Sequence, residues 1–341
     1  MHTLIIGAGV AGLSAARALI QGGLDDFAVL DLEDQAGGNA RGHHLHGLAC
    51  PLGAHYLPMP GEDAVEVAQW LEGIGLIRRE HGRWVGDERH LCHSPQERLF
   101  LPDARQDQAA FWRGQWHEGL LPQQGLSEAD LQQYRRFSRD VAQASQALGF
   151  AMPTAKRPWH AGLAALDQRT FSQWLDERGY TSRPLRWLLD YACRDDYGAG
   201  LGRVSAWAGL QYFASRHGFD VPGQGEAHDA VLTWPEGNGW LTAHLAQDLG
   251  SRWQAAQVAV RVEAGRHEVR VQSWHVRRGC LQDWQARHVI LAVPVFVAQR
   301  LLAVPLTPLA EMASRMAYAP WLVSNILLDK PFFDRPGAPL S

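Results

Sequence analysis

The sequence has little of several features that define large protein classes. Its longest apolar run, residues 289–298, is interrupted by Pro294 and is shorter than the roughly 18 to 20 residues that a membrane-spanning helix needs. The 32 Lys and Arg are outnumbered by 36 Asp and Glu, for a net charge of −4. The chain therefore lacks the excess of positive charge with which nucleic-acid-binding proteins contact phosphates. We expect neither a transmembrane segment nor a nucleic-acid partner.

Lysine and cysteine are also scarce. Only two of the basic residues are lysines, Lys156 and Lys330, which limits any mechanism that needs a lysine nucleophile or base. The four cysteines are far apart and form no C-x-x-C pair, as in proteins of a reducing compartment without a disulfide framework. No cationic leader with a cleavage site precedes the first apolar residues. These features predict a cytoplasmic protein.

The first 31 residues have the pattern of a dinucleotide-binding unit. An apolar run at residues 3–6 is followed by GAGVAG at residues 7–12 and by a helix-forming stretch. In such a unit the first glycine makes a tight turn, the second lets backbone approach a pyrophosphate, and the third lets the helix pack on the strand. A second apolar run, which we expect to lie beside the first, ends in an acidic residue suited to a ribose hydroxyl. The residues predicted to hold the dinucleotide here are Gly7, Gly9, Ala11, Gly12 and Asp31.

A second glycine pair, at residues 37–38, has no obvious use in a nicotinamide-binding domain. Together with the preceding acidic residue it resembles the flavoprotein superfamily that contains the flavin amine oxidases, phytoene-type desaturases and protoporphyrinogen oxidase. The resemblance implies FAD as the cofactor, with its diphosphate along Gly37 and Gly38. Asn39 stands where arginine is usual, with Arg41 two residues later as a candidate substitute. The GGN version is similar to UDP-galactopyranose mutase, which shares the FAD-binding core.

Two further segments extend the resemblance. The sequence PLGAHY at residues 51–56 is similar to a stretch of small residues beside the isoalloxazine ring. The resemblance implies that Gly53 and Ala54 are small because the flavin lies there. It also makes His55 the candidate catalytic residue, although the sequence fits a histidine that only ties down a loop at least as well. By the same resemblance, the backbone of Val258 holds the adenine, and the sequence HVILAVP at residues 288–294 forms a strand beneath the dinucleotide.

These segments predict an α/β fold with a discontinuous, Rossmann-like FAD-binding domain and an inserted α-rich substrate domain. The predicted FAD-binding parts are residues 1–56 and 225–297. The substrate domain takes residues 57–224, and residues 298–341 begin its second, incomplete part. The insertion carries many of the 14 tryptophans, which we expect to form plain core more often than a cavity wall.

Helix signals are clearest inside the insertion. Residues 64–74 and 126–149 are amphipathic, and Ser127 begins the second of them with an acid three residues later, as in a capping box. Thr170 and Ser182 are predicted to be further N-caps. Residues 191–212 concentrate polar and aromatic side chains. They form either a substrate-facing surface or a solvated helix end followed by a core helix.

Several kinds of site have little or no support in the sequence. His43, His44 and His46 with Cys50, and a second group at residues 90–93, contain metal-ligand residue types without the paired spacing of a zinc site, so we predict no metal. No G-x-S-x-G, H-E-x-x-H or P-loop pattern occurs, which argues against hydrolase and NTPase functions.

Two departures from the superfamily bear on function. Members close with a Gly-Asp-containing third cofactor segment, and nothing after Pro305 resembles it, so we expect a truncated gene product. Many amine oxidases of the superfamily place a lysine near flavin N5, shortly before a Pro-Phe turn, where this chain has Val323. This counts against an amine oxidase of that kind.

The leading hypothesis is an FAD-dependent oxidoreductase that transfers hydride from a small or apolar amine or alkene-type substrate to flavin N5. One alternative is an FAD-dependent mutase or isomerase of the UDP-galactopyranose mutase type. The other is a truncated, non-catalytic dinucleotide-binding remnant. The sequence predicts a small-molecule substrate and leaves the oligomeric state open.

Overall fold

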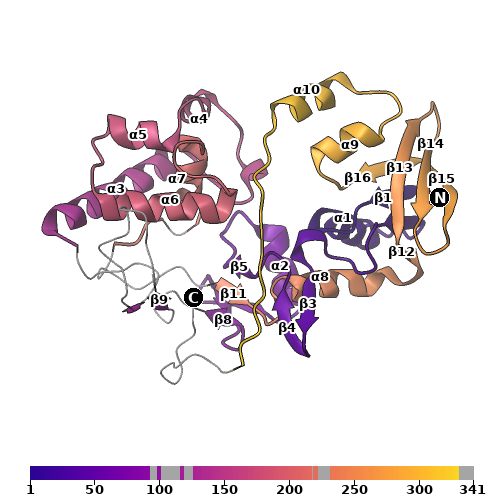
Figure 1. Ribbon diagram of the computed structural model, residues 1–341, viewed down its shortest axis with the longest axis horizontal. Coiled ribbons are helices and arrows are strands. Elements are labelled where there is room, and N and C mark those ends of the chain that lie inside the picture. Colours follow the sequence, from indigo (N-terminus) through magenta and orange to yellow (C-terminus); the bar gives the residue numbers. More distant parts are fainter. Residues whose placement is uncertain (93–97, 101–115, 119–125, 217, 222–230, 330–341) are drawn as a thin grey trace. The chain divides into compact units, whose positions relative to one another are not determined.

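The computed structural model describes residues 1–92, 98–100, 116–118, 126–216, 218–221 and 231–329 (Figure 1). The chain divides into two compact units. Unit 1 comprises Met1–Tyr56, Thr233–Tyr318 and Leu322–Leu328. Unit 2 comprises Leu57–Leu232 and Ala319–Trp321, together with Asp329. Each unit is described by itself.

Unit 1 is built on a four-stranded sheet in the order β12-β2-β1-β16, in which every neighbouring pair is parallel. Its strands are β1 (Thr3–Ile6), β2 (Phe27–Leu30), β12 (Trp253–Gln254) and β16 (His288–Leu291). All residues of β1 and β2 are buried, which explains why both read as continuous apolar runs. The predicted pairing of the first two apolar runs is confirmed, and β16 lies on the other side of β1.

The two faces of this sheet belong to different clusters of the core. Ile5, on one face of β1, packs with Leu13 of α1 (Val10–Gln21). Leu4 and Ile6 point to the other face, because side chains alternate along a strand, and pack with Val262 and Val271. Those residues come from an antiparallel sheet of β13 (Gln257–Ala264), β14 (Val269–His275) and β15 (Cys280–Ala286). The N-terminal amine donates to the carbonyl of Gln285 at 3.1 Å, which places the start of the chain beside β15 (Figure 1).

The remaining elements of unit 1 connect or cover these sheets. They are η1 (Gly38–Ala40), the hairpin of β3 (Gly42–Leu45) and β4 (Leu48–Pro51), α8 (Gly239–Ala246), η5 (Gln247–Arg252), α9 (Val295–Leu301) and α10 (Thr307–Arg315). Two short strands, β5 (Tyr56–Pro58) and β11 (Val231–Thr233), lie where the chain passes between the units.

The stretch from residue 298 to residue 318 lies in unit 1, although we assigned its sequence to the substrate domain. The physical reason is that α9 packs on the antiparallel sheet. Leu301 is buried beside Val262, and the Ala303 N–H donates to the Val262 carbonyl at 2.8 Å.

Unit 2 is rich in helices. Its helical elements are α2 (Val65–Gly73), α3 (Glu128–Leu148), η4 (Thr154–Lys156), α4 (Ala161–Asp167), α5 (Phe171–Glu177), α6 (Arg183–Tyr197) and α7 (Ala206–Ala214). Its short strands are β6 (Ile77–Glu80), β7 (Arg83–Gly86), β8 (Leu91–Cys92), β9 (Arg98–Phe100) and β10 (Trp116–Glu118). The predicted N-caps are confirmed, since the side chains of Ser127, Thr170 and Ser182 accept hydrogen bonds from the first turns of α3, α5 and α6.

The core of unit 2 is aromatic. The Phe137 ring lies within van der Waals range of several other rings, and Trp174 beside it is only 2% exposed. This tryptophan is plain core, as expected. Trp159, by contrast, is 54% exposed, so the core interpretation does not hold for every tryptophan of the insertion.

Candidate functional site

The first glycine turn leaves the N-terminus of α1 open. Gly9 is its N-cap, no side chain caps the helix, and the first turn contains no acidic residue. The free backbone N–H groups and the positive end of the helix dipole are therefore available to an anion. Gly7 has a φ of 101°. A Cβ at Gly12 would collide with the Gly7 carbonyl oxygen, so these two glycines are fixed by the protein itself, as the fingerprint requires.

The second glycine turn lies directly against the first. The Gly37 N–H donates to the Ala8 carbonyl at 2.7 Å, and a Cβ at Gly38 would lie 3.0 Å from the Gly9 Cα. Gly37 and Gly38 have φ values of 130° and 55°, which favour glycine over other residues. The structure thus brings together both predicted glycine motifs, with no side chain between them.

Asp31, at the end of β2, is hydrogen-bonded to the first turn. Its Oδ2 accepts the Ala8 N–H at 2.6 Å, and its Oδ1 accepts the Glu33 N–H at 2.9 Å. A carboxylate has about four acceptor sites, so the half-buried Asp31 retains capacity for a ribose hydroxyl. The Gln257 N–H donates to the Asp31 carbonyl at 2.7 Å. This bond places the start of β13, at the residue before Val258, against the backbone of Asp31.

Arg41 is engaged inside the second turn. Its Nε donates to the Gly38 carbonyl at 3.1 Å, and its Nη1 lies 2.8 Å from Oε2 of Glu33. The Asn39 side chain is exposed. The predicted replacement of the usual arginine by Arg41 thus acquires a partner, Glu33, which sequence reasoning missed. The available signal was an acid and a base on opposite sides of the glycine pair.

The segment of small residues lies beside the second turn. The Leu52 N–H donates to the Arg41 carbonyl at 3.0 Å, and the Ala54 N–H donates to the Asn39 carbonyl at 3.3 Å. A Cβ at Gly53 would collide with the Asn39 carbonyl oxygen. We expected Gly53 to be small because of the flavin, whereas the structure gives a reason within the protein.

His55 lies next to this segment, with an exposed side chain. Its ring meets the Tyr56 ring edge to face at 4.8 Å, and its carbonyl accepts the Thr233 hydroxyl at 3.1 Å. The backbone of His55 therefore ties this loop to Thr233, while its imidazole is open to solvent.

The polar and aromatic side chains around residues 191–212 belong to unit 2 and are used in its packing. Arg216 forms an ion pair with Asp196 at 3.0 Å, and its guanidinium carbon lies 4.1 Å from the centre of the Tyr212 ring. Burial raises the pKa of the Asp196 carboxyl against the opposing effect of Arg216, and burial raises the pKa of Tyr212 to about 12. The Tyr197 hydroxyl donates to the Ala208 carbonyl at 2.8 Å. These contacts favour the structural interpretation of the segment.

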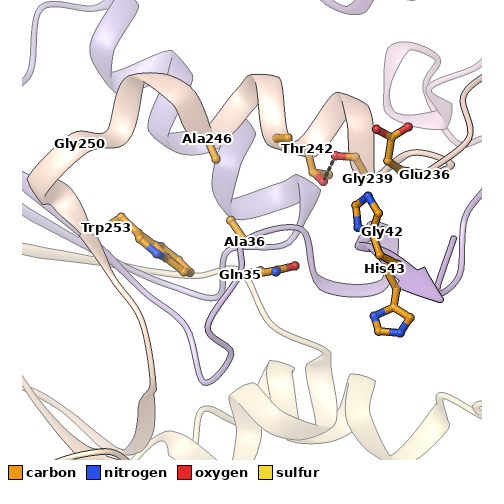
Figure 2. A pocket seen from close by; sticks show the side chains of 12 residues that line it. Gln35, Ala36, Gly42, His43, Glu236, Gly239, Thr242, Ala246, Gly250 and Trp253 are labelled. Carbon is orange, nitrogen blue, oxygen red and sulfur yellow. Dashed lines mark hydrogen bonds between the residues drawn. The ribbon is translucent and has the colours of Figure 1, made fainter. Parts of the chain in front are cut away.

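A groove of about 640 Å³ lies between α8 and residues 35–44 (Figure 2). The groove borders the second glycine turn. Thr242 lines the groove, and a Cβ at Gly37 would lie only 2.8 Å from the Thr242 Oγ1. None of the residues predicted to bind the cofactor lines it. His43, which does, comes from one of the two groups with metal-ligand residue types.

Among the described residues, no three His, Cys, Asp or Glu side chains are placed so that they could hold a metal ion. His93, of the second such group, lies outside the described residues. The described helices also include none that is long and apolar enough to cross a membrane.

The parallel sheet, the open helix N-terminus and the paired glycine turns define a dinucleotide-binding α/β protein. A family model described as flavin containing amine oxidoreductase matches residues 10–340. The chain belongs to this family. Membership confirms the resemblance inferred from the sequence and the predicted flavin cofactor, FAD.

Solved structures show the same fold at low identity. Putrescine oxidase bound to putrescine is 19% identical with a TM-score of 0.67, over 92% of this chain and 63% of that chain. Cyclohexylamine oxidase from Brevibacterium oxydans IH-35A is 20% identical with a TM-score of 0.58, over 92% and 63%. A CLA-producing fatty acid isomerase from P. acnes is 16% identical with a TM-score of 0.60, over 89% and 61%. The chain thus spans about three fifths of the length of these proteins.

Proposed function

We propose that the chain is the FAD-binding and substrate-binding part of an oxidoreductase that takes hydride from a small or apolar amine or alkene-type substrate. The observation that carries this proposal is the contact of two glycine turns at the open N-terminus of α1, with Asp31 bonded to the first turn. A diphosphate fits such a place, because the N–H groups of the first turn of α1 have no side-chain cap and a helix N-terminus attracts anions.

Each predicted residue has a role in this proposal. Asp31 would accept a hydrogen bond from a ribose hydroxyl, and the backbone of Val258 would hold the adenine. The diphosphate would lie along the two turns, formed by Gly7, Gly9, Ala11, Gly12, Gly37, Gly38, Asn39 and Arg41. Gly53 and Ala54 would flank the ring, with His55 as the nearby polar group. When bound, FAD supplies a hydride acceptor at N5, and the protein has to orient the substrate and exclude water.

The substrate class has two candidates. The names of putrescine oxidase and cyclohexylamine oxidase support an amine. The fatty acid isomerase and the valine at position 323 support the alternative, an FAD-dependent isomerase or mutase acting without net oxidation.

Anaerobic spectroscopy distinguishes these functions. The purified protein is titrated with FAD and then mixed, without oxygen, with putrescine, cyclohexylamine, an unsaturated fatty acid or UDP-galactopyranose. Bleaching of the oxidised flavin by an amine supports the oxidoreductase. Conversion of the fatty acid or the nucleotide sugar without any electron acceptor supports the isomerase or mutase. A protein that takes up no FAD contradicts both and leaves the non-catalytic remnant.

We also propose a cytoplasmic location. It is supported by Cys50, Cys193 and Cys280, which are free thiols, as expected in a reducing compartment. Fractionation of cells that express the tagged protein tests this proposal, and recovery from a secreted fraction contradicts it.

A further inference from the structure

The second glycine turn carries an ion pair with two contacts. Arg41 Nη1 lies 2.8 Å from Glu33 Oε2, and Arg41 Nη2 donates to Glu33 Oε1 at 3.1 Å. The remaining nitrogen, Nε, donates to the Gly38 carbonyl at 3.1 Å. A planar guanidinium can make these three contacts at once because its donors have a fixed fork geometry. The Arg41 side chain therefore connects Glu33, two residues after the predicted ribose carboxylate Asp31, with the second glycine turn.

Both partners are fixed to other parts of the proposed cofactor site. The Glu33 N–H donates to Asp31 Oδ1 at 2.9 Å, and the Glu33 carbonyl accepts the Ala256 N–H, just before β13, at 3.2 Å. The Arg41 carbonyl accepts the Leu52 N–H at 3.0 Å, at the start of the segment of small residues. The Glu33–Arg41 pair therefore lies where three segments of the chain meet. These are residues 31–41, the segment of small residues that begins at Leu52, and the start of β13.

The stem of Arg41 also packs on the turn. A Cβ at Gly37, where φ is 130°, would lie 2.9 Å from Arg41 Cγ. This contact and the bond to Gly38 both act on the two residues whose conformations are left-handed or close to it. Glycine adopts many backbone conformations at similar energy, so the contacts around Gly37 and Gly38 decide which conformation they hold.

The charge of Arg41 is compensated where it stands. Both terminal nitrogens face the Glu33 carboxylate, and the two side chains are only 25% and 40% exposed. A guanidinium paired in this way attracts a diphosphate less than a free one does. The positive potential at the turn then comes mainly from the N-terminus of α1.

We propose that Arg41 is a positioning residue. Held by Glu33, it fixes the second glycine turn in the conformation that receives the FAD diphosphate, and it is not the main source of charge for that diphosphate. The proposal rests on the proposed function, because it takes FAD as the ligand.

The variant Glu33→Gln tests it by the sign of the effect. If the pair positions the turn, the affinities for FAD and for ADP fall about fivefold, the size expected for a partly exposed charge-assisted contact. If Arg41 instead acts directly on the diphosphate, removal of the compensating carboxylate tightens binding. Kd values come from quenching of FAD fluorescence and from calorimetry with ADP.

Two further variants separate geometry from charge. Arg41→Lys keeps the charge but lacks the fork, so we expect a loss of about fivefold. The double variant Glu33→Gln/Arg41→Gln should bind no more weakly than Arg41→Gln alone, because each change already breaks the same pair. Arg277→Gln is the matched control. It removes an exposed guanidinium of unit 1, paired with Asp34 at 2.5 Å, and should leave both affinities unchanged.

Hydrogen exchange of the unliganded protein provides a readout that does not depend on binding. Breaking the pair should speed exchange at the N–H groups of Gly37 and Leu52. Tighter or unchanged binding by Glu33→Gln, wild-type affinity of Arg41→Lys, or unchanged exchange overturns the proposal. If the unaltered protein binds neither FAD nor ADP, the proposed function fails, while the exchange rates still decide whether the pair holds the turn.

Discussion

At the scale of single residues, Asp31 has two roles that share its carboxylate oxygens. It accepts N–H groups from Ala8 at 2.6 Å and from Glu33 at 2.9 Å, and in the proposed function it also accepts a ribose hydroxyl. The first role orders the loop before any ligand arrives. Such preorganisation lowers the entropic cost of binding.

Replacement of Asp31 with Ala tests both roles together. We expect FAD and ADP to bind more weakly by about 1 to 3 kcal/mol, the value of a charge-assisted hydrogen bond and of the loop order that goes with it. Titration calorimetry with ADP measures the change without the flavin ring. Asp34→Ala is the control, because its exposed ion pair with Arg277 contributes little. An unchanged Kd for Asp31→Ala means that the ribose has been placed wrongly.

Gly53 shows that a small residue at a predicted flavin site can have a cause within the protein. A Cβ there would collide with the carbonyl oxygen of Asn39. We expect Gly53→Ala to lower the free energy of unfolding by about 1 to 3 kcal/mol, as overpacking does, in protein free of FAD. Thermal unfolding of the apoprotein measures this change. Gly61→Ala is matched to it, since a Cβ at Gly61 meets open space, and equal melting temperatures for the two variants would contradict the prediction.

At the scale of elements, the sequence predicted those helices and strands whose limits are set by residues close by in the chain. The predicted helix at residues 126–149 is α3 (Glu128–Leu148), because Ser127 and Asp130 form a capping box and a glycine in the left-handed conformation ends it. The strand-turn-helix unit at the N-terminus also forms as predicted, since its glycines are needed for close packing.

Features that depend on contacts between residues far apart in the chain could not be predicted from the sequence. β12 has only two residues and exists because it pairs with β2. The Glu33–Arg41 pair needs the glycine turn to fold before its charges meet. The place of residues 298–318 was also missed, because it is decided by how Leu301 packs on Val262, a contact that no local pattern encodes.

The N-terminus of α3 gives a pH-dependent prediction. Burial works to raise the pKa of Asp130, but hydrogen bonds from Ser127 and Ser182 outweigh it and lower that pKa. The folded state therefore favours the ionised form. The ionised Asp130 carboxylate therefore stabilises the folded state above the pKa of the unfolded chain, about 4. This stabilisation is lost as the pH falls through the lower pKa of the folded state.

Replacement of Asp130 with Asn should thus destabilise the protein by about 1 kcal/mol at neutral pH, the size of a capping interaction. The difference from the unaltered protein should shrink below about pH 4. Urea unfolding followed by circular dichroism at several pH values measures it. Glu128→Gln, which removes an exposed acid from the same turn, controls for the loss of charge near a helix N-terminus. A difference that stays constant across the pH range would argue against the assigned hydrogen bonds.

At the scale of the whole molecule, the two units have separate hydrophobic cores. The aromatic cluster around Phe137 lies entirely in unit 2, and the clusters on both faces of the parallel sheet lie entirely in unit 1. Regions with separate cores open as separate cooperative units. All the residues predicted to bind FAD belong to unit 1.

Ligand binding should therefore protect one unit and not the other. ADP at a hundredfold excess over its Kd should stabilise unit 1 by about 2.7 kcal/mol through mass action. Amide exchange from the most protected residues of β1 and β2 should slow about a hundredfold, while exchange in α3 and α6 stays the same. Mass spectrometry of peptides from both units measures this in a single sample, with adenosine, which lacks the diphosphate, as the control ligand. Equal slowing in both units would show that they unfold together, and protection confined to unit 2 would place the nucleotide away from the paired glycine turns.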